Sequence, residues 1–470
     1  MQRRRESLCN LCASAPLRLW VESLGPFDLK DSHSSTASIR KVAIASFVGT
    51  TIEWYDFFLY GTASALVFGR LFFPNYDPLV GTLASFGTYA VGFVARPIGG
   101  IVCGHYGDRI GRKSMLIFTL SLMGVATALI GMLPTYAQIG VWAPILLVVL
   151  RLAQGFAVGG EWGGAVLMAV EHAPPGRRGF YGSWPQIGVP AGLLMATLVF
   201  GQISKLPEEA LLSWGWRVAF LLSILLVAVG LFIRMAMVEP PTFAKIKQSG
   251  TEARMPILET IRRHPRNLLL AMGARVADNG CFYLYTVFIL TYATLPKIGF
   301  SRSTVLYAVS IAAAIDFFTL PAFGLLSDFV GRRPVYLFGA IFTALFAFPY
   351  FWLIETSSTS LMVLAVVVAL VVGHAAMYGP QASFFSELFG TRVRYTGASL
   401  GYQLSSVVAG GLSPLIATDL LRRTGGSWPI ALYIMLMAAI TSVSVFLASE
   451  TAHRGIDEDA NITLQESAPG

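Results

Sequence analysis

The chain has 470 residues, of which 55% are hydrophobic and only 13% are charged, and its formal net charge is +8. Soluble domains carry roughly 25% charged residues, so a soluble protein of this length would lack the polar surface it needs. The positive charge does not indicate a nucleic-acid partner, because the basic residues stand between apolar runs and not on one basic face. Composition therefore predicts a protein embedded in a lipid bilayer.

The first 40 residues contain no apolar stretch long enough for the core of a signal peptide. We expect residues 1–40 to be a disordered cytosolic tail. Membrane-like sequence begins only at Lys41, so residues 1–38 are either native or an extension from an upstream start codon. Cys9 and Cys12 form a CxxC without a second pair or a histidine cluster, which is a weak metal signal. We expect no metal and no cofactor.

Twelve apolar stretches reach the length of about 20 residues that a membrane-spanning helix needs. Several contain Gly and Pro, which membrane helices tolerate because neighbouring helices satisfy the freed backbone groups. The expected spans are 42–68, 79–103, 114–133, 142–169, 180–203, 214–238, 267–293, 303–327, 334–354, 360–386, 396–421 and 428–449.

Loop charges predict the orientation of these spans. If the N-terminus is inside, most loop Lys and Arg residues fall on the cytosolic side, so both termini are expected in the cytosol. The longest interior loop is polar and basic, as a linker between two halves would be. The expected organisation is a cytosolic tail at 1–40, a six-helix bundle at 41–238, a linker at 239–266, a second six-helix bundle at 267–450 and a C-terminal tail at 451–470.

The two halves repeat one design. GHYGDRIGRK at 104–113 follows the second span, and GLLSDFVGRR at 324–333 follows the eighth. EWYDFFLY at 53–60 in span 1 matches DNGCFYLY at 278–285 in span 7, with an acid and a Phe-aromatic-Leu-Tyr run in the same places. A third match follows spans 4 and 10: Glu171, Arg177 and Gly182 against Glu387, Arg392 and Gly397. Internal repeats of this kind build many secondary transporters.

On these motifs the chain resembles the major facilitator superfamily, and within it the metabolite:proton symporters. The superfamily signature is the 104–113 loop; the narrower resemblance rests on residues 53–57, 95–100, 151–165 and 214–220. The second signature departs from the first, because Phe329 stands where Arg109 does. The resemblance implies an all-α membrane protein with twelve transmembrane helices in two pseudo-symmetric six-helix bundles. It also implies that spans 1, 4, 7 and 10 line a central cavity.

Ionisable residues inside a span are costly, so their default interpretation is functional. Span 1 carries Glu53 and Asp56, three residues apart and therefore on one helical face. Glu53 and Arg151 of span 4 lie roughly 16 Å and 14 Å from their span ends at the helical rise. The hypothesis is that Glu53, Asp56 and Arg151 form a proton-coupling cluster. The alternative is a static ion pair that holds spans 1 and 4 together.

Spans 7, 8 and 10 add further buried charges. Arg275 is a candidate for binding a substrate carboxylate through its planar fork, but pairing with Asp278 three residues on is a comparable alternative. An unperturbed imidazole has a pKa near neutral, so His374 is a candidate proton relay, although a lone histidine is more often a packing residue. Asp316 has no obvious partner in the sequence and is kept as a proton-coupling candidate.

Aromatic residues crowd the same spans. Tyr60, Tyr285 and Trp162 are taken, with Arg275 and Asp278, as candidate substrate contacts. Ring faces attract quaternary ammonium groups, so a cage for a betaine is one interpretation. Ordinary packing is the other, and it must account for most of the rings.

The signature loops are expected to act as gates between the halves, although their basic residues also suit a purely topogenic role. The resemblance implies the gating role, and glycine permits the tight turns involved. The candidate gating residues are Gly104, Asp108, Arg109, Gly111, Arg112, Lys113, Asp328, Arg332 and Arg333.

The leading interpretation is a proton-coupled symporter, without enzymatic activity, that imports a small carboxylate-bearing metabolite across the plasma membrane. Uptake of a zwitterionic osmolyte such as proline or glycine betaine is the alternative, and a drug exporter comes third. No channel filter, no phosphate-binding Gly-x4-Gly-Lys-Ser/Thr loop and no hydrolase motif is found. The expected partners are the metabolite, protons and the lipid bilayer, with no nucleic acid, and the chain is expected to be a monomer.

Overall fold

The computed structural model describes residues 32–75, 78–203, 205–235, 256–389 and 393–452. The chain divides into two units, Met1–Lys41 and Val42–Gly470, and the description below concerns the second unit together with the helix that leads into it. All regular secondary structure in the described ranges is helical. The expected linker at 239–266 lies outside the described residues up to position 255, and its end forms the short helix α13 (Pro256–Arg263).

Twelve long helical segments follow one another in the described ranges, and five of them contain a short π-helical stretch. In chain order they are α3 (Ser32–Ala63) with η1 (Ser64–Phe68) and α4 (Gly69–Phe72); α5 (Pro78–Ile110); α6 (Arg112–Met132); α8 (Trp142–Glu171); α9 (Arg178–Ile203); α10 (Glu208–Ala210) with η2 (Leu211–Gly215) and α11 (Trp216–Met235); α14 (Pro265–Tyr283) with η3 (Leu284–Phe288) and α15 (Ile289–Ala293); α16 (Arg302–Val330); α17 (Arg332–Glu355); α18 (Thr359–Val368) with η4 (Ala369–His374) and α19 (Ala375–Glu387); α20 (Arg394–Ser405) with η5 (Ser406–Gly411) and α21 (Ser413–Thr424); and α22 (Trp428–Leu447). The four-residue helix α7 (Tyr136–Ile139) precedes α8.

Each segment overlaps one expected span, so the twelve-span prediction is confirmed. In the described ranges, 9 helices are long and apolar enough to cross a membrane. The three segments built on α3, α5 and α14 are not among them, and each carries charged residues in mid-span: Glu53 and Asp56, Arg96, and Arg275 and Asp278, respectively.

Two helices extend well past the apolar runs that predicted them, and both end at a glycine. α5 continues through the signature loop to Gly111, whose φ is 120°, and α16 continues to Gly331, whose φ is 110°. A side chain disfavours this backbone conformation, so the signature glycines mark where each helix can turn. The polar signature residues before them are therefore helical and not loop.

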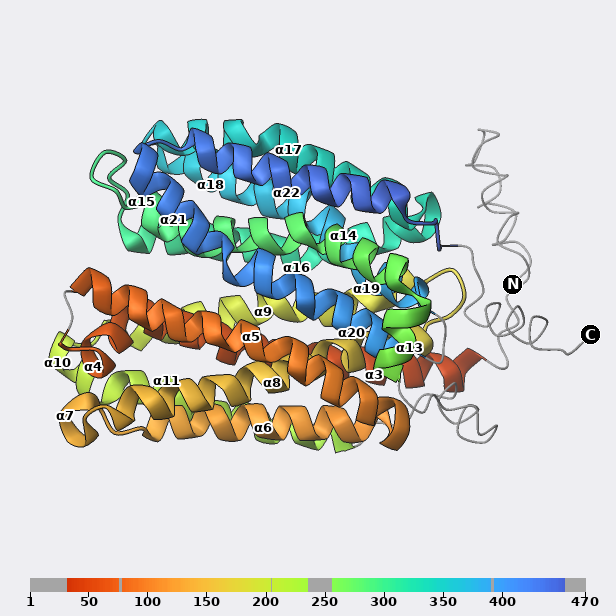
Figure 1. The fold of residues 1–470 in the computed structure, drawn as a ribbon, viewed down its shortest axis with the longest axis horizontal. Helices are drawn as coiled ribbons and strands as arrows, with labels where there is room; N and C mark the ends of the chain where they lie inside the picture. Colours follow the sequence, from red (N-terminus) through yellow and green to blue (C-terminus); the bar gives the residue numbers. More distant parts are fainter. Residues whose placement is uncertain (1–31, 76–77, 204, 236–255, 390–392, 453–470) are drawn as a thin grey trace, which may run out of the picture. The chain divides into compact units, whose positions relative to one another are not determined.

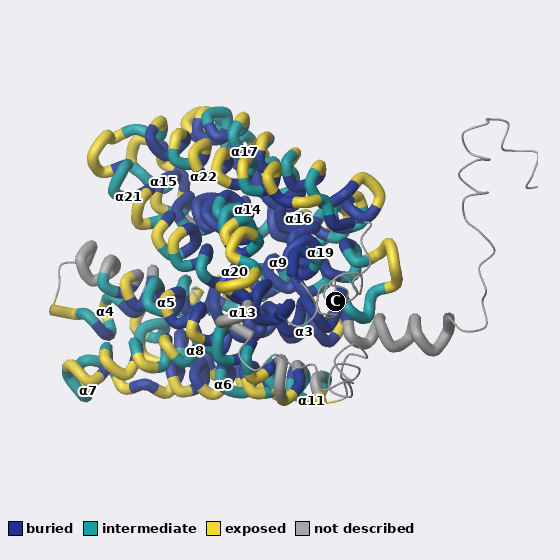
Figure 2. The backbone as a smooth tube through the Cα atoms, turned by 45° about the vertical axis from the view of Figure 1, so that its right-hand side comes forward, coloured by how far each residue is buried: buried dark blue, intermediate teal, exposed yellow. Residues whose placement is uncertain are grey.

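The segments pack as two six-helix bundles. Figure 1 shows α6, α8 and α11 on one side and α17, α18 and α22 on the other, with α9, α16, α19 and α20 between them. The bundles meet chiefly where α9 packs on α16 and α19, and where α5 packs on α20. Figure 2 shows buried backbone along this junction and exposed backbone on the outer helices.

The outer helices expose large apolar side chains. Phe232, Phe318 and Leu345 have exposed fractions of 73%, 72% and 73%. A water-soluble protein would cover such residues, because large exposed apolar patches drive association. Lipid chains cover them at no such cost, which agrees with a membrane-spanning bundle.

Glycines bring α5 and α8 into backbone contact. A Cβ added to Gly155 of α8 would lie 2.0 Å from the carbonyl oxygen of Gly92 in α5, and one added to Gly159 would lie 2.0 Å from the carbonyl oxygen of Arg96. Small residues at such positions let membrane helices approach closely. This contact sets where the side chains of α5 and α8 enter the centre of the protein.

Substitution of Gly155 tests this contact. We expect Gly155→Ala to destabilise the protein by about 1–3 kcal/mol, because the backbone of α5 cannot move away from the new methyl group without disturbing the bundle. The measurement is the thermal unfolding midpoint in detergent. Gly87→Ala in α5 is the matched control, since a Cβ there meets nothing within 4 Å. Equal midpoints for Gly155→Ala and the wild type would contradict the expectation.

Candidate substrate and proton site

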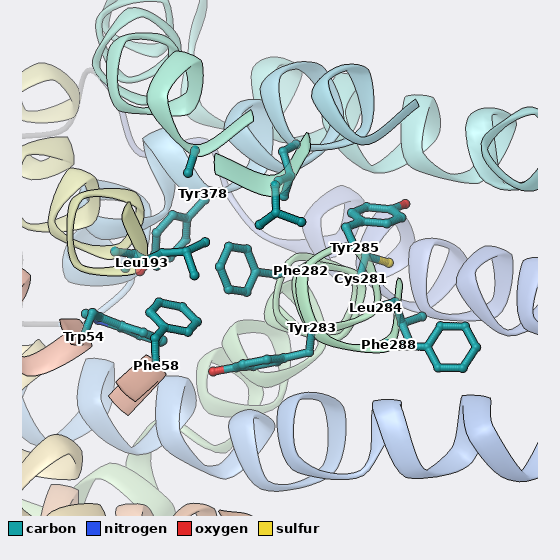
Figure 3. Close-up of a cluster of buried hydrophobic side chains, with 14 of the residues drawn as sticks. Trp54, Phe58, Leu193, Cys281, Phe282, Tyr283, Leu284, Tyr285, Phe288 and Tyr378 are labelled. Carbon is teal, nitrogen blue, oxygen red and sulfur yellow. The ribbon is translucent and has the colours of Figure 1, made fainter. Parts of the chain in front are cut away.

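A small cavity lies between the two bundles near the middle of the helices, with a volume of about 10 Å³, which is room for about one water molecule. One bundle contributes side chains from α3 and α9, and the other from α14, η4 and α19. Figure 3 shows Trp54 and Phe58 facing Phe282 and Tyr378 across this region. The lining residues are Trp54, Val189, Arg275, Asp278, Asn279, Phe282, His374 and Tyr378.

The C-terminal bundle places an arginine and a chain of titratable groups at this cavity. Arg275 Nη1 lies 2.6 Å from Asp278 Oδ2 in an ion pair, and both side chains are buried. On the other side of Asp278, His374 Nε2 lies 3.4 Å from Asp278 Oδ1. His374 Nδ1 in turn lies 3.5 Å from Asp316 Oδ2. The sequence left Asp316 without a partner; the structure joins it to Asp278 through one imidazole.

Gln381 and Tyr402 hold this cluster in place, and the sequence analysis named neither. Gln381 accepts from Arg275 Nη1 at 2.6 Å and donates to Asp278 Oδ2 at 2.9 Å, so it bridges the ion pair. The guanidinium carbon of Arg275 lies 3.2 Å from the Tyr402 ring centroid, a cation–π contact. Trp162 stacks on the other side of Tyr402 at 3.6 Å, so this predicted substrate residue lies behind Tyr402. Gln381 and Tyr402 are uncharged, so hydropathy and buried charge do not single them out within an apolar span.

Asp56 and Arg151 do not meet directly. Asp56 is fully buried and turned toward α6 and α11, where it accepts from Thr127 Oγ1 at 2.9 Å and from the Ser223 hydroxyl. Thr127 accepts from Gln154 Nε2 at 2.7 Å, and Gln154 accepts from Arg151 Nη1 at 3.0 Å. The two charges are therefore joined by a hydrogen-bonded chain. The i, i+3 spacing placed Asp56 near the face of Glu53, but the rotation of α3 turns Asp56 away from the cavity.

Two arginines of the N-terminal bundle lie among aromatic rings. The guanidinium carbon of Arg151 is 4.2 Å from the Tyr60 ring centroid, and that of Arg96 in α5 is 4.3 Å from the Phe93 centroid. Desolvated contacts of this kind contribute about 2 kcal/mol each. The sequence analysis missed Arg96 as a site residue, although an arginine before Pro97 in mid-span carries the same signal as Arg151.

The other predicted contacts lie apart from the cavity lining. Tyr60 bonds to Thr88 Oγ1 at 2.7 Å, and Tyr285 packs on Tyr350 with ring centroids 4.8 Å apart. Figure 3 shows Tyr285 on a different side of its helix from Phe282. Glu53 is buried in α3 next to Trp54.

Aromatic rings of the two bundles pack on one another beside the cavity. Phe58 meets Phe282 and Phe93 meets Tyr283 across the bundles, with centroids 6.1 Å and 5.5 Å apart. Within the C-terminal bundle, the hydroxyl groups of Tyr378 and Tyr402 lie 3.2 Å apart. A solute enters this cavity only when some of these rings part.

At the end of the bundles that carries the signature loops, Asp328 joins the two halves. Its carboxylate accepts from the backbone N–H groups of Gly179 at 2.7 Å and Phe180 at 2.9 Å, at the start of α9. A carboxylate at a helix N-terminus is stabilised by the unsatisfied N–H groups and the helix dipole. Arg332 Nη1 holds the same carboxylate at 2.7 Å and Arg332 Nη2 lies 3.2 Å from Glu387. This arrangement is a lock between the bundles.

The remaining predicted gating residues fall in three groups. Gly104 lies against Thr396 of α20, where a Cβ would be 3.1 Å from the threonine Oγ1. Lys113 Nζ donates to the Met235 carbonyl at 2.7 Å, and Arg333 Nε donates to the Val445 carbonyl at 3.1 Å, so both stay within their own bundles. The side chains of Asp108, Arg109 and Arg112 lie outside the described part of the structure.

Glu450, just after α22, caps α17 and was not found from the sequence. Its carboxylate accepts from the backbone N–H groups of Arg332, Arg333, Thr451 and Ala452 at 2.9–3.0 Å. Burial raises the pKa of Glu450, but these four donors outweigh it and hold the pKa below its ordinary value. The end of the last span is thereby fastened to the second signature.

Comparison with known proteins places these features in a family. A profile described as Major Facilitator Superfamily matches residues 46–414. The "Shikimate transporter" of Escherichia coli (strain K12) is 42% identical over 421 residues, covering 89% of this chain and 96% of that protein. The "Proline/betaine transporter" of the same organism is 34% identical, covering 91% and 87%. The proton:xylose symporter XylE, solved with 6-bromo-6-deoxy-D-glucose, has the same fold, with a TM-score of 0.70, 16% identity and coverage of 91% and 99%.

The Asp328 lock yields a prediction about conformation. A hydrogen bond to a charged group contributes about 1.5–3 kcal/mol, so Asp328→Asn should raise the population open at the signature loops roughly tenfold or more. The measurement is the maleimide labelling rate of Ser183→Cys, which lies buried beside Gly324, with all four native cysteines replaced by serine. Asp419→Asn is the control, because Asp419 pairs only locally with Arg422 and Arg423. An unchanged labelling rate would show that the carboxylate does not hold the lock.

Proposed function

The chain belongs to the major facilitator superfamily, and on that premise we propose that it carries a small carboxylate-bearing metabolite together with protons, by alternating access. It is a membrane transporter and not an enzyme, as are the relatives it resembles. The observation that carries the proposal is a row of titratable side chains, Asp278, His374 and Asp316. It starts next to Arg275, which lines the cavity and pairs with Asp278. A buried anion-binding group beside a proton-carrying group is what coupled transport of an acid requires.

The coupling follows from competition for Arg275. A substrate carboxylate that binds this guanidinium takes it from Asp278, which is then a buried carboxylate without its cation. Such a group binds a proton, because desolvation disfavours the charged form. His374 is placed to deliver that proton from Asp316, since each of its ring nitrogens faces one carboxylate. Substrate and proton would thus be bound together and released together.

The N-terminal cluster is a second candidate for the proton. Glu53, Asp56 and Arg151 would act through the hydrogen-bonded chain of Gln154 and Thr127, since Asp56 and Arg151 are not in contact. Trp162 would act on substrate indirectly through Tyr402, whereas Tyr60 and Tyr285 would reach it only after a rearrangement.

We place the protein in the bacterial inner membrane as a monomer with both termini in the cytosol. With that orientation the Asp328 lock is on the cytosolic side, and the conformation described is closed to the cytosol. The substrate class is supported by the relative named as a shikimate transporter. The relative named as a proline/betaine transporter keeps a zwitterionic osmolyte as the second candidate.

Uptake into proteoliposomes tests the function. With an acidic exterior, we expect accumulation of labelled shikimate above the external concentration and loss of this accumulation when a protonophore is added. Proline and glycine betaine are tested in parallel. Accumulation that survives the protonophore would exclude proton coupling, and accumulation of the zwitterions alone would establish the second candidate.

Asp316→Asn separates proton coupling from substrate binding. We expect it to abolish gradient-driven accumulation while leaving exchange of internal for external substrate, which needs no net proton movement, within about threefold of wild type. Asp56→Asn is the matched change in the N-terminal bundle, and Asp419→Asn controls for loss of an exposed carboxylate. If Asp56→Asn gives this result and Asp316→Asn does not, the proton passes through the N-terminal cluster.

A further inference from the structure

Arg96 lies near the middle of α5, and its side chain is 1% exposed. Its guanidinium carbon is 4.4 Å from the Phe57 ring centroid, 4.3 Å from that of Phe93 and 5.7 Å from that of Trp54. Trp54 also lines the central cavity. Arg96 therefore stands one ring away from the cavity, on the side of the N-terminal bundle.

Several N–H groups of the Arg96 guanidinium have no hydrogen-bond acceptor among the described residues. Its Nε and Nη2 are buried and have no hydrogen-bond acceptor in the described structure. No carboxylate of the described part forms an ion pair with it, whereas Arg275, Arg332 and Arg394 each have one. A ring face attracts the positive charge but is a weak acceptor of N–H hydrogen bonds. A buried cation in this condition is costly, and a bound anion would stabilise it.

Arg151 is similarly placed but differently connected. Its Nη1 donates to Gln154, and that chain leads to Asp56. Arg96 has no such link to a carboxylate. Tyr283 and Tyr402 each interact electrostatically with both Arg96 and Arg275, and Tyr283 is also within hydrogen-bonding reach of Arg96. A carboxylate has two oxygens and can accept from both guanidinium groups at once.

We propose that Arg96 binds the negatively charged group of the substrate from the N-terminal bundle, opposite Arg275, and so selects organic anions over zwitterions. This inference rests on the proposed function and names the substrate class of that site. The aromatic box that a quaternary ammonium would need is already filled, because Trp54, Phe57 and Phe93 surround the guanidinium of Arg96. A ligand cation entering this box would meet a like charge.

Binding to the purified full-length chain, without a proton gradient, tests the proposal. The probes are shikimate, its uncharged methyl ester and glycine betaine, and the readout is the dissociation constant from ligand-dependent thermal stabilisation. We expect the wild type to bind shikimate more tightly than the ester. Arg96→Lys should weaken shikimate binding at least tenfold, because lysine lacks the planar fork. Arg96→Gln should also remove the preference for shikimate over its ester.

Arg217→Lys is the matched control for loss of a guanidinium that packs on a ring. Arg217 lies 4.5 Å from the Trp216 ring centroid and donates to the carbonyls of Gly131 and Leu133, away from the cavity. Its binding constants should equal those of the wild type. A merely structural Arg96 would lower the unfolding midpoint of the ligand-free variants but leave the preference for the anion unchanged.

Two results would overturn the proposal: an unchanged preference in Arg96→Gln, or wild-type binding of glycine betaine without binding of shikimate. Failure of proton coupling gives a different result. A wild type that binds shikimate through Arg96 but accumulates it in the presence of a protonophore would refute coupled transport and retain this assignment.

Discussion

A charge buried in an apolar layer costs several kcal/mol unless something nearby compensates it, and the interior of this protein is arranged around that cost. Arginine side chains of both bundles lie almost completely buried. Arg275 and Arg332 are neutralised by carboxylates at 2.6 Å and 2.7 Å, and Arg394 lies 3.4 Å from Glu171. Arg96 and Arg151 rely largely on aromatic rings. An arginine paired with a carboxylate stabilises the fold, whereas an arginine that has mainly ring faces beside it is available to bind an anionic ligand.

The internal repeat is preserved in the backbone and altered in its chemistry. Gly111 and Gly331 have nearly the same φ, 120° and 110°, and end equivalent helices. Both bundles bury an acid in the equivalent place, Glu53 and Asp278, but its surroundings differ. Arg96 and Arg151 lie among rings in one bundle, whereas His374 lies between two carboxylates in the other. Two bundles that move against each other around one solute gain from this asymmetry. One bundle can hold the anion while the other changes its protonation.

Hydropathy predicted all twelve spans, because the length of an apolar run is a local property set by the thickness of the bilayer. The same reasoning found buried charges in mid-span, Arg275, Asp278, Asp316 and His374, since each is expensive there. Reasoning from hydropathy could not identify the partners of these charges. Spacing places residues on a common face but does not give the rotation of the helix, and that rotation turns Asp56 toward α6 and α11.

Contacts that depend on distant parts of the chain were missed for a related reason. Gln381 lies 106 residues from Arg275, and Glu450 lies 118 residues from Arg332. Each contact exists only after several helices have packed, so no local pattern announces it. Arg96 is a different case. It lies inside the family motif at 95–100, and a motif match does not show whether a buried charge has a partner.

The Asp328 lock and the cluster of Asp278, His374 and Asp316 lie at different depths, which explains how the lock can open while the cluster stays intact. The Asp328 lock lies at the bundle end, so water can replace its partners when the bundles part. The net cost of breaking such a charged hydrogen bond is then about 1.5–3 kcal/mol, far below the cost of leaving the carboxylate bare in an apolar medium. The cluster of Asp278, His374 and Asp316 lies at mid-depth near rings that pack across the bundles, and exchange with water requires these rings to part first. A bound anion that draws Arg275 and Arg96 together favours the closed arrangement, and its release favours the open one. The ligand can shift this equilibrium only by its difference in affinity for the two arrangements. A carboxylate held by one arginine from each bundle would have that difference, because parting the bundles would separate the two arginines.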